Sequence, residues 1–457
     1  MKKHFFFSFL CFLLISSYVT AQDGSDMPFS MNGYGRASVY GGGDKYALSS
    51  VFSELSLQTS VTGSHSFLEA DIRFRTGMFF NQNETTIQIK ELYAGYKSQA
   101  FDVLLGNQIV TWGRTEGFSP TNNITPNDYF FLSSDPNDQR LSNFMLKMNY
   151  RPAIGIGLEL IAIPFYKMSR YRFDLFDMGF ETDGLVLGGF DQIDIGNLID
   201  FGNDMVPEKI LANGSYAARA DFDFSVLGGS VSWFRGYDPY HGFDVVSVNW
   251  STGQPVIRIA SMPYLKTTIG ADLDIPIGSL LIVKAEAAYN HTVNPKNYIY
   301  IPKPDISYVV GLETNLLGFM ILGQYIGKYT FGFSPLAKPP VPSSGNVAEL
   351  FQFAEDMIDY ETRLFNRKVF NQQEKTNHAL FLMVTRMFAY DVITAECTGY
   401  YNLTSGEWFV RPKVSWRISD TFAVSAGGNY MKGKNKTLYG FSGPVMNGVF
   451  TEFRVIF

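Results

Sequence analysis

The stretch Val449–Phe457, which reads VFTEFRVIF, decides the fold class because its residue types alternate with a period of two. Apolar or β-branched residues occupy the odd positions, whereas Glu452 and Arg454 lie on the other face. Successive side chains of a β-strand point to opposite faces, so the alternation predicts a strand with one apolar and one polar face.

A last strand that ends in an aromatic residue, here Phe457, resembles the signal by which the barrel-assembly machinery of the outer membrane recognises its clients. The resemblance implies that this machinery is a partner of the chain, through that strand. It favours an outer-membrane β-barrel over the alternative, which is a soluble secreted β-protein.

Other segments repeat the alternation with charged residues on one face. In Phe67–Phe79, charged residues alternate with Leu68, Ala70, Ile72 and Phe74. A charge that faces lipid at mid-membrane costs a few kcal/mol, so these side chains are predicted to line a wet lumen. The predicted lumen-lining residues are Glu69, Asp71, Arg73, Arg75, Arg219, Asp221, Asp223, Asp272, Asp274, Lys284, Glu286, Arg411, Lys413 and Arg417.

The composition fits a protein that crosses the membrane with strands. Of 457 residues, 46% are hydrophobic and 16% are aromatic, yet the mean hydropathy is −0.02. No mature segment approaches the roughly 18 consecutive apolar residues that a spanning helix needs, which leaves a closed antiparallel barrel in contact with outer-membrane lipid. A formal net charge of −6 argues against nucleic acid as a partner.

The N-terminus predicts export. Lys2 and Lys3 precede an apolar run from Phe5 to Ile15 and a polar stretch that closes on Ala21. This pattern is typical of a cleaved signal peptide over residues 1–21, which leaves 22–457 as a single barrel domain in a Gram-negative-type outer membrane. Cys397 is then the only cysteine, so neither a disulfide framework nor a cysteine metal site is expected, and no cofactor is implied.

Connection lengths give an all-β barrel of about 18 strands, with 16 as the alternative. Tight turns alternate with long connections, as in outer-membrane barrels, and both termini fall on the short-turn side. The count stays open because 244–259 also fits an external hairpin, and because the alternation slips at Lys90 and Glu91. The predicted long loops are Asn81–Thr85, Arg114–Leu141, Ser169–Asn213, Tyr237–Pro263, His291–Pro304 and Gly332–Lys375.

One loop carries a local motif. Trp112-Gly113-Arg114 closes the stretch that begins at Gly106, and Pro126-Asn127-Asp128-Tyr129 follows. The motif resembles a poorly characterised family of large porin-like outer-membrane barrels, although Asn122 stands where that family has an acid. The resemblance implies a transport or diffusion channel without an established substrate.

The sequence is compatible with two placements of this loop. It could fold inward and narrow the pore, or it could cap the barrel from outside, with Trp112 in the aromatic girdle at the membrane interface. Its acids lie between two arginines in the sequence, but their spacing lacks the ligand pattern of a calcium loop. The candidate constriction residues are Trp112, Arg114, Asp128, Asp135, Asp138 and Arg140.

The last long loop contains an apolar pattern of helical period over Val347–Phe370. Leu350, Ala354 and Met357 lie on one face, and acidic residues lie on the other. We expect an amphipathic helix, which could lie across the mouth of the barrel, plug it, or rest its apolar face on neighbouring loops.

These features favour a passive channel for small polar solutes through a charge-lined lumen. A plugged barrel that displays loops or binds a glycan is the first alternative, and a hydrophobic-solute transporter or an outer-membrane hydrolase is the second. No enzyme activity is expected, because the five histidines are scattered and no nucleophile motif accompanies them. Whether barrels associate into a homo-oligomer stays open.

Overall fold

The computed structural model describes residues 29–43, 48–172, 175, 199–202, 204–249, 256–342, 346–434 and 437–457. The predicted signal peptide, residues 1–21, lies outside the described residues. Among the helices in these ranges, none is long and apolar enough to cross a membrane.

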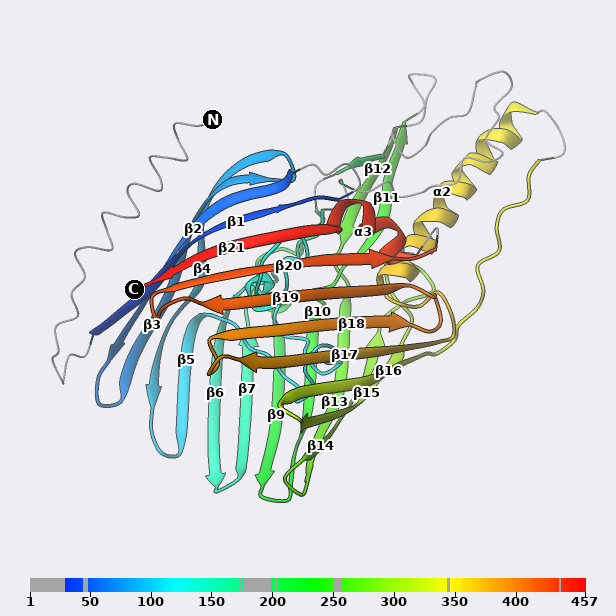
Figure 1. Cartoon of the computed structure of the whole chain (residues 1–457). Coiled ribbons are helices and arrows are strands. Elements are labelled where there is room, and N and C mark those ends of the chain that lie inside the picture. Colours follow the sequence, from blue (N-terminus) through cyan, green and yellow to red (C-terminus); the bar gives the residue numbers. More distant parts are fainter. Residues whose placement is uncertain are drawn as a thin grey trace.

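An 18-stranded antiparallel barrel forms the body of the molecule, which confirms the predicted fold class and strand number (Figure 1). Consecutive barrel strands pair with each other, and β21 closes the barrel on β1. The barrel strands are β1 (Phe29–Gly41), β2 (Leu48–Thr62), β3 (Ser66–Phe79), β4 (Gln82–Lys97), β5 (Phe101–Gln108), β6 (Asn143–Ala153), β7 (Ile156–Ile163), β9 (Ser215–Phe224), β10 (Leu227–Tyr237), β13 (Leu265–Ile277), β14 (Leu281–Thr292), β15 (Asp305–Leu316), β16 (Phe319–Thr330), β17 (Thr376–Phe388), β18 (Ile393–Asn402), β19 (Trp408–Arg417), β20 (Phe422–Lys432) and β21 (Gly448–Ile456).

The closing seam involves the last residue of the chain. Gly33 N–H donates to Phe457 O at 2.9 Å, and Phe457 N–H donates to Gly33 O at 3.0 Å. A Cβ on Gly33 would lie 2.4 Å from Ser56 O and 2.8 Å from the Phe457 ring, so only glycine fits here.

The two ends of the barrel differ, as the connection lengths predict. All the predicted tight turns, near residues 62–64, 98–102, 151–155, 226–229, 276–279, 316–318, 390–391 and 419–420, lie at the end where β1 begins and β21 ends, which we call the short-turn end. The predicted long loop Asn81–Thr85 is wrong, because only Phe80 and Asn81 separate β3 from β4. Both residues have positive φ, 45° and 65°, which is the backbone of a two-residue hairpin turn that asparagine tolerates well.

The slip in the alternation at Lys90 is a β-bulge. The register shifts between Asp71 and Ile72, whose partners on β4 are Glu91 and Ile89, so Lys90 has no partner opposite it on β3. A bulge inserts one residue and re-aims a side chain. Lys90 is buried, and its contacts are described below.

The barrel wall is apolar on its outer face. On β3, Leu68, Ile72 and Phe74 are exposed, whereas Arg73 between them is buried. The alternation therefore separates apolar from charged side chains, as a strand with lipid on one side requires.

A small sheet and a helix extend beyond the barrel at the long-loop end (Figure 1). The hairpin predicted within 244–259 is present outside the barrel, where its two strands pair with each other and the second also pairs with β8. The predicted amphipathic helix is also present. These elements are β8 (Ile199–Phe201), β11 (Gly242–Asn249), β12 (Val256–Met262) and α2 (Val347–Val369), and a second helix, α3 (Leu438–Met446), precedes β21.

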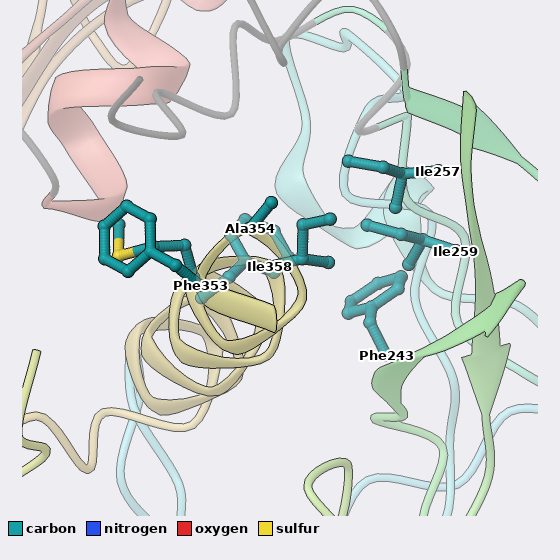
Figure 2. Close-up of a cluster of buried hydrophobic side chains, with 8 residues drawn as sticks. Phe243, Ile257, Ile259, Phe353, Ala354 and Ile358 are labelled. Carbon is teal, nitrogen blue, oxygen red and sulfur yellow. The ribbon is translucent and has the colours of Figure 1, made fainter. Parts of the chain in front are cut away.

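The helix α2 packs its apolar face against the hairpin of β11 and β12. Figure 2 shows Ala354 and Ile358 on the side of the helix that faces Phe243, Ile257 and Ile259, in one buried cluster. Polar contacts fix the end of the helix as well. Asn366 Nδ2 donates to Phe243 O at 2.7 Å and to Ile299 O at 3.1 Å.

Candidate functional site

The segment 109–142, which joins β5 to β6, lies inside the barrel (Figure 1). Its residues bond to side chains from β1 and β19, which lie near the seam, and from β14, which lies several strands away from both. Gln324 of β16 also donates to Glu116 O. We call this segment the inner loop.

The reading of the inner loop as an external cap, with Trp112 in the aromatic girdle, is wrong. Trp112 is 3% exposed and packs with Val110, Ile124 and Met145 in a buried apolar cluster. Its Nε1 donates to Glu159 Oε1 of β7 at 2.5 Å. The girdle assignment assumed that Trp112 lies at the end of a membrane strand. β5 ends at Gln108, so the tryptophan belongs to the loop that follows.

The first part of the inner loop is anchored by Glu286 of β14. Its Oε1 accepts hydrogen bonds from the N–H groups of Arg114 and Thr115 at 2.6 and 2.5 Å, and from Thr115 Oγ1 at 2.7 Å. Its Oε2 accepts from Ser119 Oγ at 2.7 Å and from Thr121 Oγ1 at 3.1 Å. A buried carboxylate is costly unless it is paired or hydrogen-bonded, and this one is satisfied by the loop itself.

Arg114 adds ion pairs to the same anchor. Its Nε lies 3.0 Å from Asp272 Oδ1, and its Nη1 lies 2.7 Å from Asp274 Oδ1, both on β13. Gly113 lets the loop approach so closely, because a Cβ there would lie 2.6 Å from Glu286 Oε1. Its φ of +101° also favours glycine. We call Glu286, Asp272, Asp274 and Arg114 the β13–β14 anchor.

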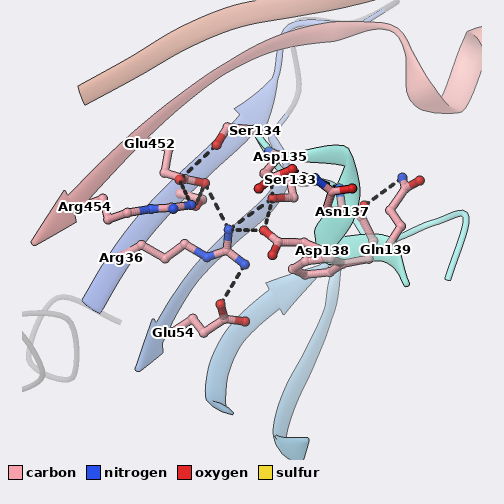
Figure 3. Close-up of polar contacts among 12 residues, drawn as sticks. Arg36, Glu54, Ser133, Ser134, Asp135, Asn137, Asp138, Gln139, Glu452 and Arg454 are labelled. Carbon is pink, nitrogen blue, oxygen red and sulfur yellow. Dashed lines mark hydrogen bonds and ion pairs between the residues drawn. The ribbon is translucent and has the colours of Figure 1, made fainter. Parts of the chain in front are cut away.

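The second part of the inner loop is anchored at the seam of the barrel by Asp138. Its Oδ2 lies 2.6 Å from Arg36 Nη1 of β1, and its Oδ1 lies 2.8 Å from Arg73 Nη1 of β3. Arg36 in turn reaches Glu54 Oε1 of β2 at 2.7 Å and Glu452 Oε2 of β21 at 3.4 Å. Figure 3 shows Arg36 at the centre of these acids.

Further donors hold the backbone of the same stretch. Lys90 Nζ donates to the carbonyl oxygens of Asn137, Asp138 and Arg140 at 3.1, 2.9 and 2.6 Å. On the other side, Arg411 Nη2 of β19 donates to Ser133 O and Ser134 O at 2.8 and 2.9 Å. We call Asp138 with Arg36, Arg73, Lys90 and Arg411 the seam anchor.

The electrostatics of the seam anchor keep Asp138 ionised. Burial alone raises the pKa of the Asp138 carboxyl, but the positive charges of Arg36 and Arg73 outweigh burial and hold its pKa well below its usual range. Ser133 Oγ donates to Oδ2 at 2.5 Å and acts in the same direction.

A cavity of about 450 Å³ lies between the inner loop and another part of the wall. The inner loop supplies Gly117, Phe118 and Gln139, and strands β16 to β19 supply most of the rest. Lys328 and Asn377 are polar groups in this lining. The aromatic residues of the lining are Phe118, Phe381, Tyr400, Phe409 and Tyr439.

The other constriction candidates have local roles. Asp135 caps a short 3₁₀ helix by accepting from Asn137 N–H at 2.9 Å. Asp128 lies 3.8 Å from Arg170, and burial raises its pKa. Arg140 shares an isolated bridge with Asn127, and its carbonyl accepts from Lys90. The loop acids are therefore not paired with Arg114.

The remaining lumen candidates pair mainly along the wall. Among the shortest pairs are Arg75 with Glu54 at 2.5 Å and Lys284 with Glu313 at 2.6 Å. Asp223 and Arg417 lie exposed near the short-turn end. The other contacts join Glu69 to Ser60, Asp71 to Arg73, Arg219 to Asp221, and Lys413 to Glu396.

Several anchoring residues escaped the sequence analysis as site residues, namely Arg36, Glu54, Lys90, Glu159 and Glu452. Of these residues, only Lys90 was marked in the sequence, by the slip in the strand alternation that the bulge causes. Within the described ranges, no group of three or more histidine, cysteine or acidic residues could hold a metal ion.

No protein-family model matches the chain, and no curated protein matches it in sequence. Solved structures share its fold. OccAB3 of Acinetobacter baumannii superposes with a TM-score of 0.51 at 8% identity, over 94% of this chain and 98% of that one. OpdK of Pseudomonas aeruginosa, solved with vanillate, gives the same values. OccK5 (OpdH) of Pseudomonas aeruginosa gives a TM-score of 0.50 at 10% identity, over 94% and 97% of the two chains. The chain therefore has the fold of outer-membrane porins over nearly its whole length.

Proposed function

We propose that the chain is an outer-membrane channel for the passive diffusion of small polar solutes, and that its inner loop is the constriction. The observation that carries the proposal is the inner loop itself, which is fixed at two separate parts of the wall and leaves a cavity of about 450 Å³ beside a third.

The proposal includes the maturation of the chain. Residues 1–21 are removed as a signal peptide, and 22–457 form one barrel domain that reaches the outer membrane through the assembly machinery. The proposal assigns no catalytic step to any residue.

The lining of the cavity suggests which solutes to test. Aromatic rings such as Phe381 and Tyr400 offer flat apolar contacts, and Lys328, which lies 3.7 Å from Asp305 Oδ2, adds a cationic group to the lining. Vanillate, with which OpdK was solved, combines an aromatic ring with a carboxylate. It is therefore one solute to compare with a neutral sugar of similar size.

The test is single-channel conductance and ion selectivity of the refolded mature chain in a planar bilayer, with the variant Asp138→Asn. We expect stable openings from the unchanged chain and larger or noisier openings from the variant, because the seam anchor loses a charge held by Arg36 and Arg73. The matched control is Asp135→Asn, since asparagine caps a helix as well as aspartate does and Asp135 is not part of the seam anchor.

The result that overturns the proposal is silence of both the unchanged chain and Asp138→Asn, with folding verified by circular dichroism. That result would favour a barrel that displays its external sheet and helix α2 to a partner.

A further inference from the structure

Large apolar side chains that are at least 66% exposed stand at the tips of the short turns on one side of the barrel only. The tips of the turns β6/β7, β9/β10, β13/β14, β15/β16 and β17/β18 belong to strands that follow one another around the wall. We call these turns the apolar arc. The tip residues and their exposed fractions are Ile154 at 100%, Val226 at 73%, Leu280 at 66%, Leu317 at 83% and Tyr390 at 101%.

The short turns in the rest of the circumference carry no large apolar side chain that is exposed to this degree. The turn β2/β3 consists of 63–65 and the turn β4/β5 of 98–100. The turn β19/β20 consists of 418–421, in which Ile418 is 46% exposed and the other three residues are Ser419, Asp420 and Thr421. We call these turns the polar arc, which also contains the seam. The short-turn end is therefore two-sided.

Turn formation does not explain the residues of the apolar arc. Leu317 and Tyr390 have positive φ, 53° and 57°. Bulky side chains rarely adopt this conformation, and asparagine or glycine would suit it better. A contact made by the exposed side chain outside the turn would explain why leucine and tyrosine stand there.

The surface that continues into the apolar arc is the lipid-facing wall. Leu312 and Leu316 of β15 are exposed on the outer face, and Leu317 follows them at the tip. Likewise, Phe388 ends β17 exposed on the same face as Leu380 and Leu382, two residues before Tyr390. Tips of neighbouring hairpins lie about 10 Å apart, at two strand spacings. Such scattered side chains suit a fluid apolar phase better than a protein partner, whose contacts cluster in packed pockets.

We propose that the apolar arc inserts into the periplasmic leaflet of the outer membrane, and that phospholipid is its partner. One side of the barrel then sits deeper than the polar arc, with Tyr390 at the depth that interfacial aromatic residues prefer. This inference rests on the membrane location proposed above but is independent of whether the barrel conducts.

Spin labels at the turn tips test the depth. In the background Cys397→Ser, which removes the exposed cysteine of β18, single labels are placed by Leu317→Cys and Tyr390→Cys on the apolar arc. Ser64→Cys and Asp420→Cys serve as controls on the polar arc. The refolded chain is reconstituted in vesicles of phosphatidylethanolamine and phosphatidylglycerol, and collision rates with oxygen and with a water-soluble nickel chelate are measured by electron paramagnetic resonance.

We expect the labels of the apolar arc to collide more often with oxygen and the controls more often with the chelate. Labels that all prefer the chelate would overturn the inference, and so would labels that all prefer oxygen, because the asymmetry would be lost. Labels shielded from both reagents would overturn it in favour of a protein contact. Conductance of each labelled chain, measured separately, keeps a failure of this inference distinct from a failure of the channel.

The variant Leu317→Asn adds an independent check. Asparagine suits the positive φ of this turn, so the barrel should be at least as stable in detergent. In vesicles, a label at Tyr390→Cys should move toward the chelate, since part of the arc is lost. A barrel that is destabilised in detergent, with the label unchanged in vesicles, would assign Leu317 a purely structural role.

Discussion

At the scale of single residues, Glu286 explains why the inner loop has one conformation. Its two oxygens accept from backbone N–H groups and hydroxyls that are spread over residues 114–121. Residues 114–121 contribute no side chain to the buried apolar clusters on either side of them, so the order of this stretch depends on an acceptor supplied by the wall. A fully satisfied buried network of this kind rigidifies the structure around it.

The substitution Glu286→Gln should lower the free energy of unfolding of the barrel by about 3 kcal/mol. The amide has only one acceptor oxygen, and its NH₂ group would face loop N–H and hydroxyl groups that donate to the carboxylate in the unchanged chain. The measurement is the urea midpoint of the refolded chain in vesicles. Glu313→Gln is the matched control, since Glu313 is more exposed and pairs with Lys284 at the wall. Equal shifts for the two variants would contradict the anchoring role.

The pH below which the constriction loosens should be set by protonation of the Asp138 carboxylate. Its pKa is lowered from the ordinary value of 3.8. A depressed pKa contributes stability that is present above the unfolded pKa and is lost as pH falls through the folded one. Single-channel conductance should therefore stay constant from pH 7 to about pH 4 and rise only below that, and Asp138→Asn should show no such rise. A transition near pH 6 in the unchanged chain would assign the gate to another group.

The sequence identified some of these residues but not how they pair. Arg114 and Asp138 were candidates, yet Arg114 pairs with Asp272 and Asp274 of the wall, and Asp138 pairs with Arg36 and Arg73. Ion pairs across a lumen depend on which strands face each other after closure. That information lies in the register of the whole barrel and not in any local spacing.

At the scale of elements, strands were predictable because alternation is a local signal, and turns because they are marked by Gly, Asn, Asp or Pro. The helix α2 was predictable from its period. The helix α3 was not, because LYGFSGPVM contains two glycines and Pro444, which are poor helix formers. The inner loop has no period at all, so only its contacts reveal that it turns inward.

The helix α2 depends on Asn366 for its attachment. The variant Asn366→Leu has similar volume but loses the hydrogen bonds to Phe243 and Ile299. Hydrogen exchange should become faster over α2, as expected for a local loss of about 2 kcal/mol, while the urea midpoint of the barrel stays unchanged. Asp359→Asn on the same helix is the control, because its exposed pair with Arg363 contributes little. Unchanged exchange in Asn366→Leu would mean that the apolar cluster alone holds the helix.

At the scale of the whole molecule, the inner loop connects regions of the wall that are remote in the barrel. The β13–β14 anchor and the seam anchor lie on strands separated by several neighbours on either side. Loss of one anchor leaves the loop tethered by the other, so its ends cannot move independently. The constriction should therefore open cooperatively.

A double-mutant cycle measures this cooperativity. Glu286→Gln and Asp138→Asn should each raise the conductance moderately, and the double variant should raise it by more than the product of the two single effects, with a coupling of about 1 kcal/mol or more. The pair Glu313→Gln with Asp135→Asn, which leaves both anchors in place, should show no coupling. If the two anchor variants combine without coupling, the two parts of the inner loop move separately and each forms its own gate. The cavity beside residues 117 and 118 would then be bounded by two mobile segments rather than by one rigid loop.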